Sequence, residues 1–231
     1  MTTPLKLAIW DVDGTIVDSR QVIQKAMDRA FKRAGLGGID YDRTRTIVGL
    51  ELGEAVARLA PPDYPAEKAV QLATFYKEAF VEQRAEPGFE EPLYDGVRDT
   101  IERLVEQGWL MGVATGKARR GLDIVFDHHD LHRYFDTFQT VDGGAGKPHP
   151  RMVLDAMRET GTDAFQAVMI GDTKFDMEMG RNAGVHTLGV SWGFHTLDEI
   201  AEGGAHSIHH DFAELDAALD DFAVQVDEQA A

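Results

Sequence analysis

Two aspartates one residue apart, Asp11 and Asp13, stand directly after a short apolar run near the start of the chain. The run, from Leu5 to Trp10, has the composition of a buried strand, and Gly-Thr follows the second aspartate. Two carboxylates so close together repel each other, and the low dielectric at the edge of a protein core strengthens the repulsion. A turn, a bound metal or a reaction must therefore explain the pair.

Polar residues with complementary chemistry follow other apolar runs farther along the chain. They are Thr115, Gly116, Lys117, Lys147, Asp172 and Asp176. Mg²⁺ prefers a few carboxylate or carbonyl oxygens, and a phosphoryl group binds hydroxyls, backbone amides and a cation. If the apolar runs are parallel strands, their carboxyl ends meet at one edge of the sheet, where ligands bind. The sequence therefore predicts a site for Mg²⁺ and phosphate at this edge.

The elements that must position these residues alternate along the chain. Between the apolar runs, apolar residues recur at helical spacing, as in the segment that begins at Val97 and ends at Gly108. The pattern predicts a doubly wound α/β fold with a parallel, Rossmann-like sheet. The predicted strands are Leu5 to Trp10, Trp109 to Ala114, Asp136 to Val141, Ala167 to Gly171 and His186 to Val190.

Residues 18–92 interrupt this alternation with one helical pattern after another. One amphipathic face begins at Val22 and a second begins at Ala69, and the stretches "GLGGID" and "APPDYP" separate the patterns as turns. We predict that residues 18–92 form an α-helical domain. It is inserted into an α/β domain that consists of residues 1–17 and 93–231 and carries the site.

Composition excludes several classes of function. The 231 residues carry a formal net charge of -17 and include no cysteine, so no disulfide, thiolate zinc site or cysteine nucleophile is possible. The negative charge argues against nucleic-acid and anionic-membrane partners. No run approaches the roughly 18 apolar residues of a membrane helix, and the N-terminal stretch has no apolar core typical of a secretory signal. We expect a cytoplasmic protein.

Four short motifs in order, "DVDGT", "ATG", "GKPHP" and "GDTKFD", resemble those of the haloacid dehalogenase superfamily. The helical insertion after the first motif is similar to the small α-helical cap of that family. Within the family, the phosphoglycolate-phosphatase-like hydrolases are the subgroup that the chain resembles most. The resemblance covers nearly the whole chain and implies a Mg²⁺-dependent phosphatase that acts on a small phosphorylated metabolite, as a monomer or homodimer.

The resemblance also implies a role for each acidic residue. Asp11 is the nucleophile that forms an aspartyl-phosphate, and Asp13 protonates the leaving oxygen and then activates water. Mg²⁺ is held by the Asp11 carboxylate, the Asp13 backbone carbonyl and Asp172. Asp176 supports the metal site, partly through water.

Further residues are expected to contact the substrate. The resemblance implies that Thr115 and the Gly116 amide bind the phosphoryl oxygens, while Lys147 neutralises the nucleophile and the transferring group. Arg45 can meet a carboxylate of a phosphoglycolate-like substrate, but a solvated helix residue is an equal alternative.

Other functions stay open. Relatives that cleave phosphonates or carbon–halogen bonds lack the second aspartate, so Asp13 favours a phosphatase or a phosphomutase. A phosphate-sensing module would also combine aspartates, threonine and lysine at such a sheet edge. For single residues, Thr115 can instead be the N-cap of the next helix and Asp176 a first-turn carboxylate.

Two more stretches carry reactive side chains. "GVSWG", around Ser191, matches the G-x-S-x-G nucleophile elbow, but no helical pattern follows it directly. "HSIHH", His206 to His210, could bind a metal, although we expect a surface loop after an edge strand.

Overall fold

The computed structural model of the chain describes residues 4–231. The prediction that the chain has no secretory signal rests on the N-terminal stretch. The first three residues of this stretch lie outside the described residues. None of the described helices is long and apolar enough to cross a membrane.

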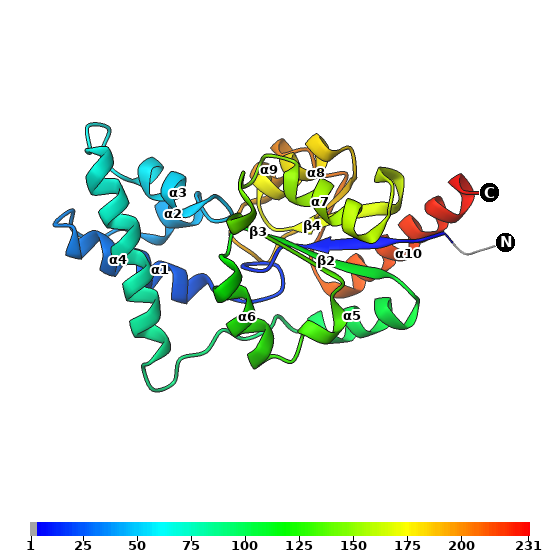
Figure 1. Cartoon of the computed structure of the whole chain (residues 1–231), viewed down its shortest axis with the longest axis horizontal. Coiled ribbons are helices and arrows are strands. Elements are labelled where there is room, and N and C mark those ends of the chain that lie inside the picture. The colour runs from blue at the N-terminus through cyan, green and yellow to red at the C-terminus, as the bar shows by residue number, and fades with distance from the viewer. Residues whose placement is uncertain (1–3) are drawn as a thin grey trace.

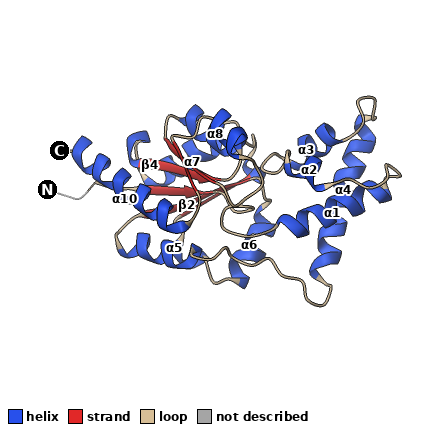
Figure 2. Ribbon diagram, turned by 180° about the vertical axis from the view of Figure 1, so that it is seen from behind, coloured by secondary structure: helices blue, strands red, loops and turns tan. Residues whose placement is uncertain are grey.

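Six strands form one sheet, and each neighbouring pair of strands is parallel. Their order is β3-β2-β1-β4-β5-β6, and Figure 2 shows the sheet between layers of helices. The predicted α/β fold is thereby confirmed, and each of the five predicted strands overlaps one observed strand, with ends that differ by at most two residues. The strands are β1 (Leu7–Trp10), β2 (Leu110–Thr115), β3 (Thr137–Thr140), β4 (Ala167–Gly171), β5 (His186–Val190) and β6 (Ser207–His209).

Helices cover both faces of the sheet (Figure 1), and the central strands β1 and β4 are accordingly apolar and buried on both sides. In β1, Ala8 and Trp10 belong to the core beneath α5 (Val97–Glu106), α6 (Arg119–His128) and α10 (Phe212–Gln229). Leu7 and Ile9 point the other way and pack with α7 (Arg151–Thr160) and α8 (Lys174–Ala183). A further helix, α9 (Leu197–Glu202), packs beside α8.

The stretch from His206 to His210 differs from the prediction, because it contains the edge strand β6 instead of a loop. Its residues pair with β5 in the register Leu188↔Ser207 to Val190↔His209. This strand has only three residues, so an alternation of apolar and polar residues cannot be recognised in the sequence. The His206 ring stacks on His186, with ring centroids 4.2 Å apart.

Four helices follow β1 before the next strand begins: α1 (Arg20–Arg33), α2 (Tyr41–Arg45), α3 (Leu52–Leu59) and α4 (Ala66–Arg84). We call them the helical insert. Figure 1 shows them together beyond the end of β1 to which its arrow points. They share an apolar core that includes Met27, Phe31, Val56 and Leu72 and that Phe175 and Phe194 of the sheet domain join. This agrees with the predicted helical insertion, whose exact limits at residues 18 and 92 stay a prediction.

Candidate functional site

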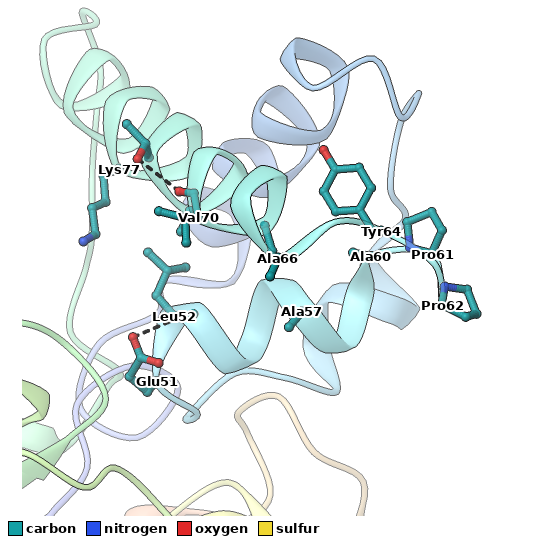
Figure 3. Close-up of a pocket in the computed structure, with 14 residues that line it drawn as sticks. Glu51, Leu52, Ala57, Ala60, Pro61, Pro62, Tyr64, Ala66, Val70 and Lys77 are labelled. Carbon is teal, nitrogen blue, oxygen red and sulfur yellow. Dashed lines mark hydrogen bonds between the residues drawn. The ribbon is translucent and has the colours of Figure 1, made fainter.

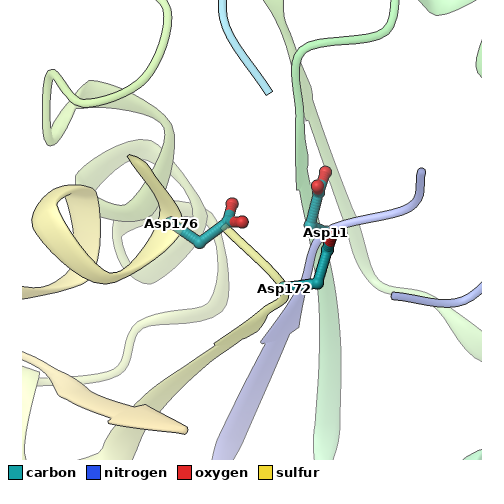
Figure 4. A group of neighbouring side chains, drawn as sticks. All are labelled: Asp11, Asp172 and Asp176. Atoms are coloured by element: carbon teal, nitrogen blue, oxygen red, sulfur yellow. The ribbon is translucent and has the colours of Figure 1, made fainter. Parts of the chain in front are cut away.

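Three buried aspartates converge at the carboxyl ends of β1 and β4 (Figure 4). Asp11 follows β1, Asp172 follows β4, and Asp176 lies in the first turn of α8. One carboxylate oxygen from each residue lies within 4.8 Å of the others. The strand order changes direction between β1 and β4, which is where ligands bind in doubly wound sheets.

Lys147 is the buried cation of this group. Its Nζ atom lies 2.7 Å from Asp11 Oδ1 and 2.6 Å from Asp176 Oδ1. Burial lowers the pKa of Lys147, but the negative charges of Asp11 and Asp176 outweigh that effect and raise the pKa above its ordinary value. Lys147 therefore stays protonated beside both carboxylates.

Asp172 is held by neutral donors. One of its oxygens accepts a hydrogen bond from Thr15 Oγ1 at 2.9 Å, and the other accepts one from the Phe194 amide at 2.7 Å. Burial, followed by the charges of Asp176 and Asp11, raises the pKa of Asp172 well above its ordinary value. This carboxylate is costly to ionise without a nearby positive charge.

The charge balance of the cluster fits a divalent cation. Burial raises the pKa of Asp11 to about 7, although Lys147 acts in the opposite direction. Three carboxylates and one lysine leave excess negative charge in a buried place once all four groups are ionised. Oxygen ligands of this kind and number suit Mg²⁺, which also retains water ligands.

Asp176 has two neighbours that fix its carboxylate. Its Oδ2 accepts hydrogen bonds from the Thr173 amide at 3.0 Å and from Thr173 Oγ1 at 2.6 Å, as part of a capping box at the start of α8. Its other oxygen contacts Lys147. Asp176 thus occupies the first turn of α8, as its alternative interpretation held, and it also contacts the lysine that pairs with Asp11, while its role in the metal site stays a prediction.

Two glycines leave the space that Asp172 occupies. A Cβ atom added to Gly193 would lie 2.1 Å from Asp172 Oδ2, and one added to Gly14 would lie 2.3 Å from the same atom. Gly14 also has a φ of 86°, in the left-handed region. The "GVSWG" stretch therefore encloses Asp172. Helix α9 begins only at Leu197, so Ser191 does not sit on the strand-to-helix turn of a nucleophile elbow.

A cavity of about 610 Å³ opens above Asp11, between the sheet edge and the helical insert. Its lining includes Asp11, Asp13, Thr115, Gly116 and Lys117. The structure thus brings the predicted phosphate-binding residues to the same cavity as the two aspartates. The N-cap of α6 is Ala118, so the alternative that Thr115 caps this helix is wrong.

Lys117 is the residue of this site to which the sequence analysis assigned no role. Its Nζ lies 3.0 Å from Asp13 Oδ1 and 3.8 Å from Glu91 Oε1. Glu91 is buried and also pairs with Arg84 at 3.1 Å. The position of Lys117 after a predicted strand could have indicated that it belongs to the site. Glu91 and Arg84 belong to no motif, and only the fold brings Glu91 to Lys117 and Arg84 to Glu91.

Comparison with known proteins agrees with this geometry. The family model described as haloacid dehalogenase-like hydrolase matches residues 8–190. The chain belongs to this family. It is 32% identical over 212 residues to the probable phosphatase IndB of Dickeya dadantii, with 90% of this chain and 91% of the relative covered. It is 29% identical over 215 residues to a phosphoglycolate phosphatase of Agrobacterium fabrum, covering 92% and 91%.

A solved structure supports the fold independently. The crystal structure of a predicted phosphatase from Clostridium acetobutylicum superposes with a TM-score of 0.83 at 24% identity, covering 94% of this chain and 98% of the other. The predicted family and the prediction of an enzyme are confirmed.

In this haloacid dehalogenase-like hydrolase, Arg45 lies apart from the residues that line the cavity above Asp11. Its Nη1 forms an ion pair with Glu199 Oε2 at 2.6 Å, which joins α2 of the insert to α9 of the sheet domain. The contact between Arg45 and a substrate carboxylate stays a prediction, while in this structure the Arg45 side chain pairs with Glu199. The sequence could not reveal Glu199 as the partner, because the two residues are far apart in the chain.

The hydrolase has a second cavity of about 650 Å³ between α3 and α4 (Figure 3). Glu51, Leu52 and Lys77 line both cavities. The remaining lining of the second cavity is mostly small or apolar, and none of the three clustered aspartates belongs to it. We therefore assign the candidate active site to the cavity above Asp11.

Proposed function

We propose that this hydrolase is a Mg²⁺-dependent phosphatase that cleaves a small phosphomonoester through an aspartyl-phosphate on Asp11. The observation that carries the proposal is the contact of Asp11 with the buried, protonated Lys147, together with the cavity that Asp11, Asp13 and Thr115 line. The phosphatase names of the relatives support the same reaction class.

The acidic cluster offers ligands for one Mg²⁺ ion. The Asp11 carboxylate, the Asp172 carboxylate and the Asp13 backbone carbonyl would hold it, while Asp176 keeps Lys147 in place. When bound, Mg²⁺ supplies Lewis-acid stabilisation of the negative charge on the phosphoryl group.

The side chains then divide the reaction into two steps. A carboxylate oxygen of Asp11 attacks phosphorus, and the bond from phosphorus to the ester oxygen breaks as Asp13 gives its proton to that oxygen. Asp13 next accepts a proton from water, whose oxygen attacks phosphorus and releases Asp11 and inorganic phosphate. The Thr115 hydroxyl and the Gly116 amide orient the phosphoryl oxygens, and Lys147 offsets their charge.

Hydrolysis of p-nitrophenyl phosphate tests this proposal. The wild-type protein should release phosphate with Mg²⁺ and lose this activity with EDTA, and Asp11→Asn should be inactive in both conditions. Activity that survives EDTA, or full activity in Asp11→Asn, would sink the proposal. Stable phosphorylation of Asp11 without turnover would instead indicate a phosphate-sensing module.

A further inference from the structure

The part of the cavity wall that the helical insert contributes is mainly apolar. It comes from α1, α3 and α4 and from the loop that joins α2 to α3, and includes Ile23, Met27, Ile47, Val48, Leu50 and Phe80. The cavity of about 610 Å³ is also far larger than a phosphate group with a two-carbon acid requires. Cavities of roughly 300–1,000 Å³ with mainly apolar linings accommodate much larger organic ligands.

Cations near the inner part of the cavity already have carboxylate partners. Lys117 contacts Asp13 at 3.0 Å, and Arg84 contacts Glu91 at 3.1 Å. A carboxylate on the substrate would have to compete for these cations or be buried without a partner, which is unfavourable.

The two other basic residues of the lining, Lys77 and Arg120, are exposed. The acidic residues Glu51 and Asp142 also line the cavity, so their two negative charges balance the two positive charges of Lys77 and Arg120. This outer region therefore shows no excess positive charge that would select an anionic group.

Exposed apolar side chains lie on both sides of the cavity. Val81 on α4 is 64% exposed and Ile124 on α6 is 43% exposed, and both belong to the cavity lining. Neither side chain contributes to the buried core of its domain. Exposed apolar surface beside a cavity is typical of a place that a ligand covers.

We propose that the alcohol part of the substrate is uncharged and apolar, and that it extends from the phosphate site to Val81 and Ile124. This inference rests on the proposed phosphatase function. It names a class of substrate different from phosphoglycolate, because burial of an apolar group against these walls stabilises the complex whereas burial of a carboxylate does not.

A series of primary alkyl phosphates tests the proposal. Ethyl, butyl and hexyl phosphate and 2-phosphoglycolate share the same kind of ester bond, so they differ mainly in what the cavity must bind. We expect kcat/KM to rise about fourfold for each added methylene group and to be lowest for 2-phosphoglycolate. A flat series, or a preference for 2-phosphoglycolate over hexyl phosphate, would overturn the inference.

Variants of the exposed residues locate the binding surface. In Val81→Gln and Ile124→Gln, the ratio of kcat/KM for hexyl to ethyl phosphate should fall about fivefold. Val224→Gln and Leu154→Gln are matched controls, because these residues are 55% and 45% exposed and line neither cavity. If Val81→Gln and Ile124→Gln lower kcat/KM for ethyl and hexyl phosphate by the same factor, Val81 and Ile124 do not contact the alkyl chain. That result would contradict the proposal.

The same measurements separate the two proposals. If none of the phosphomonoesters, including p-nitrophenyl phosphate, is hydrolysed, the phosphatase function fails and the substrate class fails with it. If 2-phosphoglycolate is hydrolysed best, the function stands and only the apolar substrate is excluded.

Discussion

Asp11 and Asp176 both contact Lys147, but the surroundings of the two carboxylates differ. Lys147 contacts both, but Asp176 is also fixed by two hydrogen bonds from Thr173. Asp11 belongs to the cavity lining, whereas Asp176 does not. We therefore propose that Asp11 is the carboxylate that attacks a substrate and that Asp176 orients Lys147.

The raised pKa of Asp11 predicts that Mg²⁺ stabilises the protein more at pH 8 than at pH 6. Burial raises this pKa to about 7 in the folded protein, so in the absence of metal the carboxyl group contributes stability at low pH that is lost as the pH rises through about 7. Mg²⁺ requires the ionised carboxylate and must displace its proton at pH 6. Thermal unfolding with and without Mg²⁺ at both pH values measures the difference. An equal shift in Tm at the two pH values would contradict it.

Lys117 is predicted to position Asp13. In Lys117→Met the ion pair of 3.0 Å is lost, so the Asp13 carboxyl group is no longer fixed for proton transfer, and kcat should fall at least about tenfold. Steady-state kinetics with p-nitrophenyl phosphate gives kcat and KM separately. Lys68→Met, an exposed residue of α4 outside both cavities, is the control. An unchanged kcat in Lys117→Met would show that Lys117 does not position Asp13 for the reaction.

Among the elements, the segment after β5 has the most direct effect on the site. Gly193→Ala would place a Cβ atom 2.1 Å from Asp172 Oδ2 and force this carboxylate to move. We expect phosphatase activity to fall about a hundredfold, together with most of the thermal stabilisation by Mg²⁺. In Gly143→Ala, the nearest atom to the new Cβ is Arg151 Nη2 at 3.9 Å, so this variant is the matched control. Normal Mg²⁺ stabilisation in Gly193→Ala would show that Asp172 does not hold the metal.

The strands that carry the site could be predicted from the sequence because they are buried on both faces. β1 and β4 are continuous apolar runs that end in aspartate, and these features are visible without a structure. β6 was missed because it has three residues, two of them polar. The role of Gly193 was also hidden, because its contact with Asp172 depends on the path of the chain after β5.

At the scale of the whole molecule, the active site lies between two parts that touch closely. A Cβ on Gly116 would lie 2.8 Å from the Gly49 carbonyl oxygen, so a loop of the helical insert rests against one of the predicted phosphate-binding residues. The ion pair between Arg45 and Glu199 also joins these parts. Such contacts between distant segments cannot be predicted from local patterns, so the sequence offered for Arg45 only a substrate contact or a solvated position, and not its pairing with Glu199.

Loss of the ion pair between Arg45 and Glu199 should weaken the contact between the helical insert and the sheet domain. The preference among substrates should stay unchanged. Burial opposes ionisation of Glu199, but hydrogen bonds from Thr196 and Arg45 lower its pKa to about 2. We expect Arg45→Gln to lower the free energy of unfolding by about 1 kcal/mol, measured by urea denaturation. The kcat/KM values for ethyl phosphate and 2-phosphoglycolate should change by the same factor. A selective loss for 2-phosphoglycolate would restore Arg45 as a carboxylate-binding residue.

The proposed mechanism requires that Asp11 becomes phosphorylated during turnover. Peptide mapping by mass spectrometry, after acid quench of the enzyme turning over p-nitrophenyl phosphate with Mg²⁺, tests it most directly. We predict one phosphoryl group on the peptide that contains Asp11, and none in Asp11→Asn or in EDTA. Steady phosphate release with no phosphoryl group on that peptide, or with the group on another residue, would contradict the account.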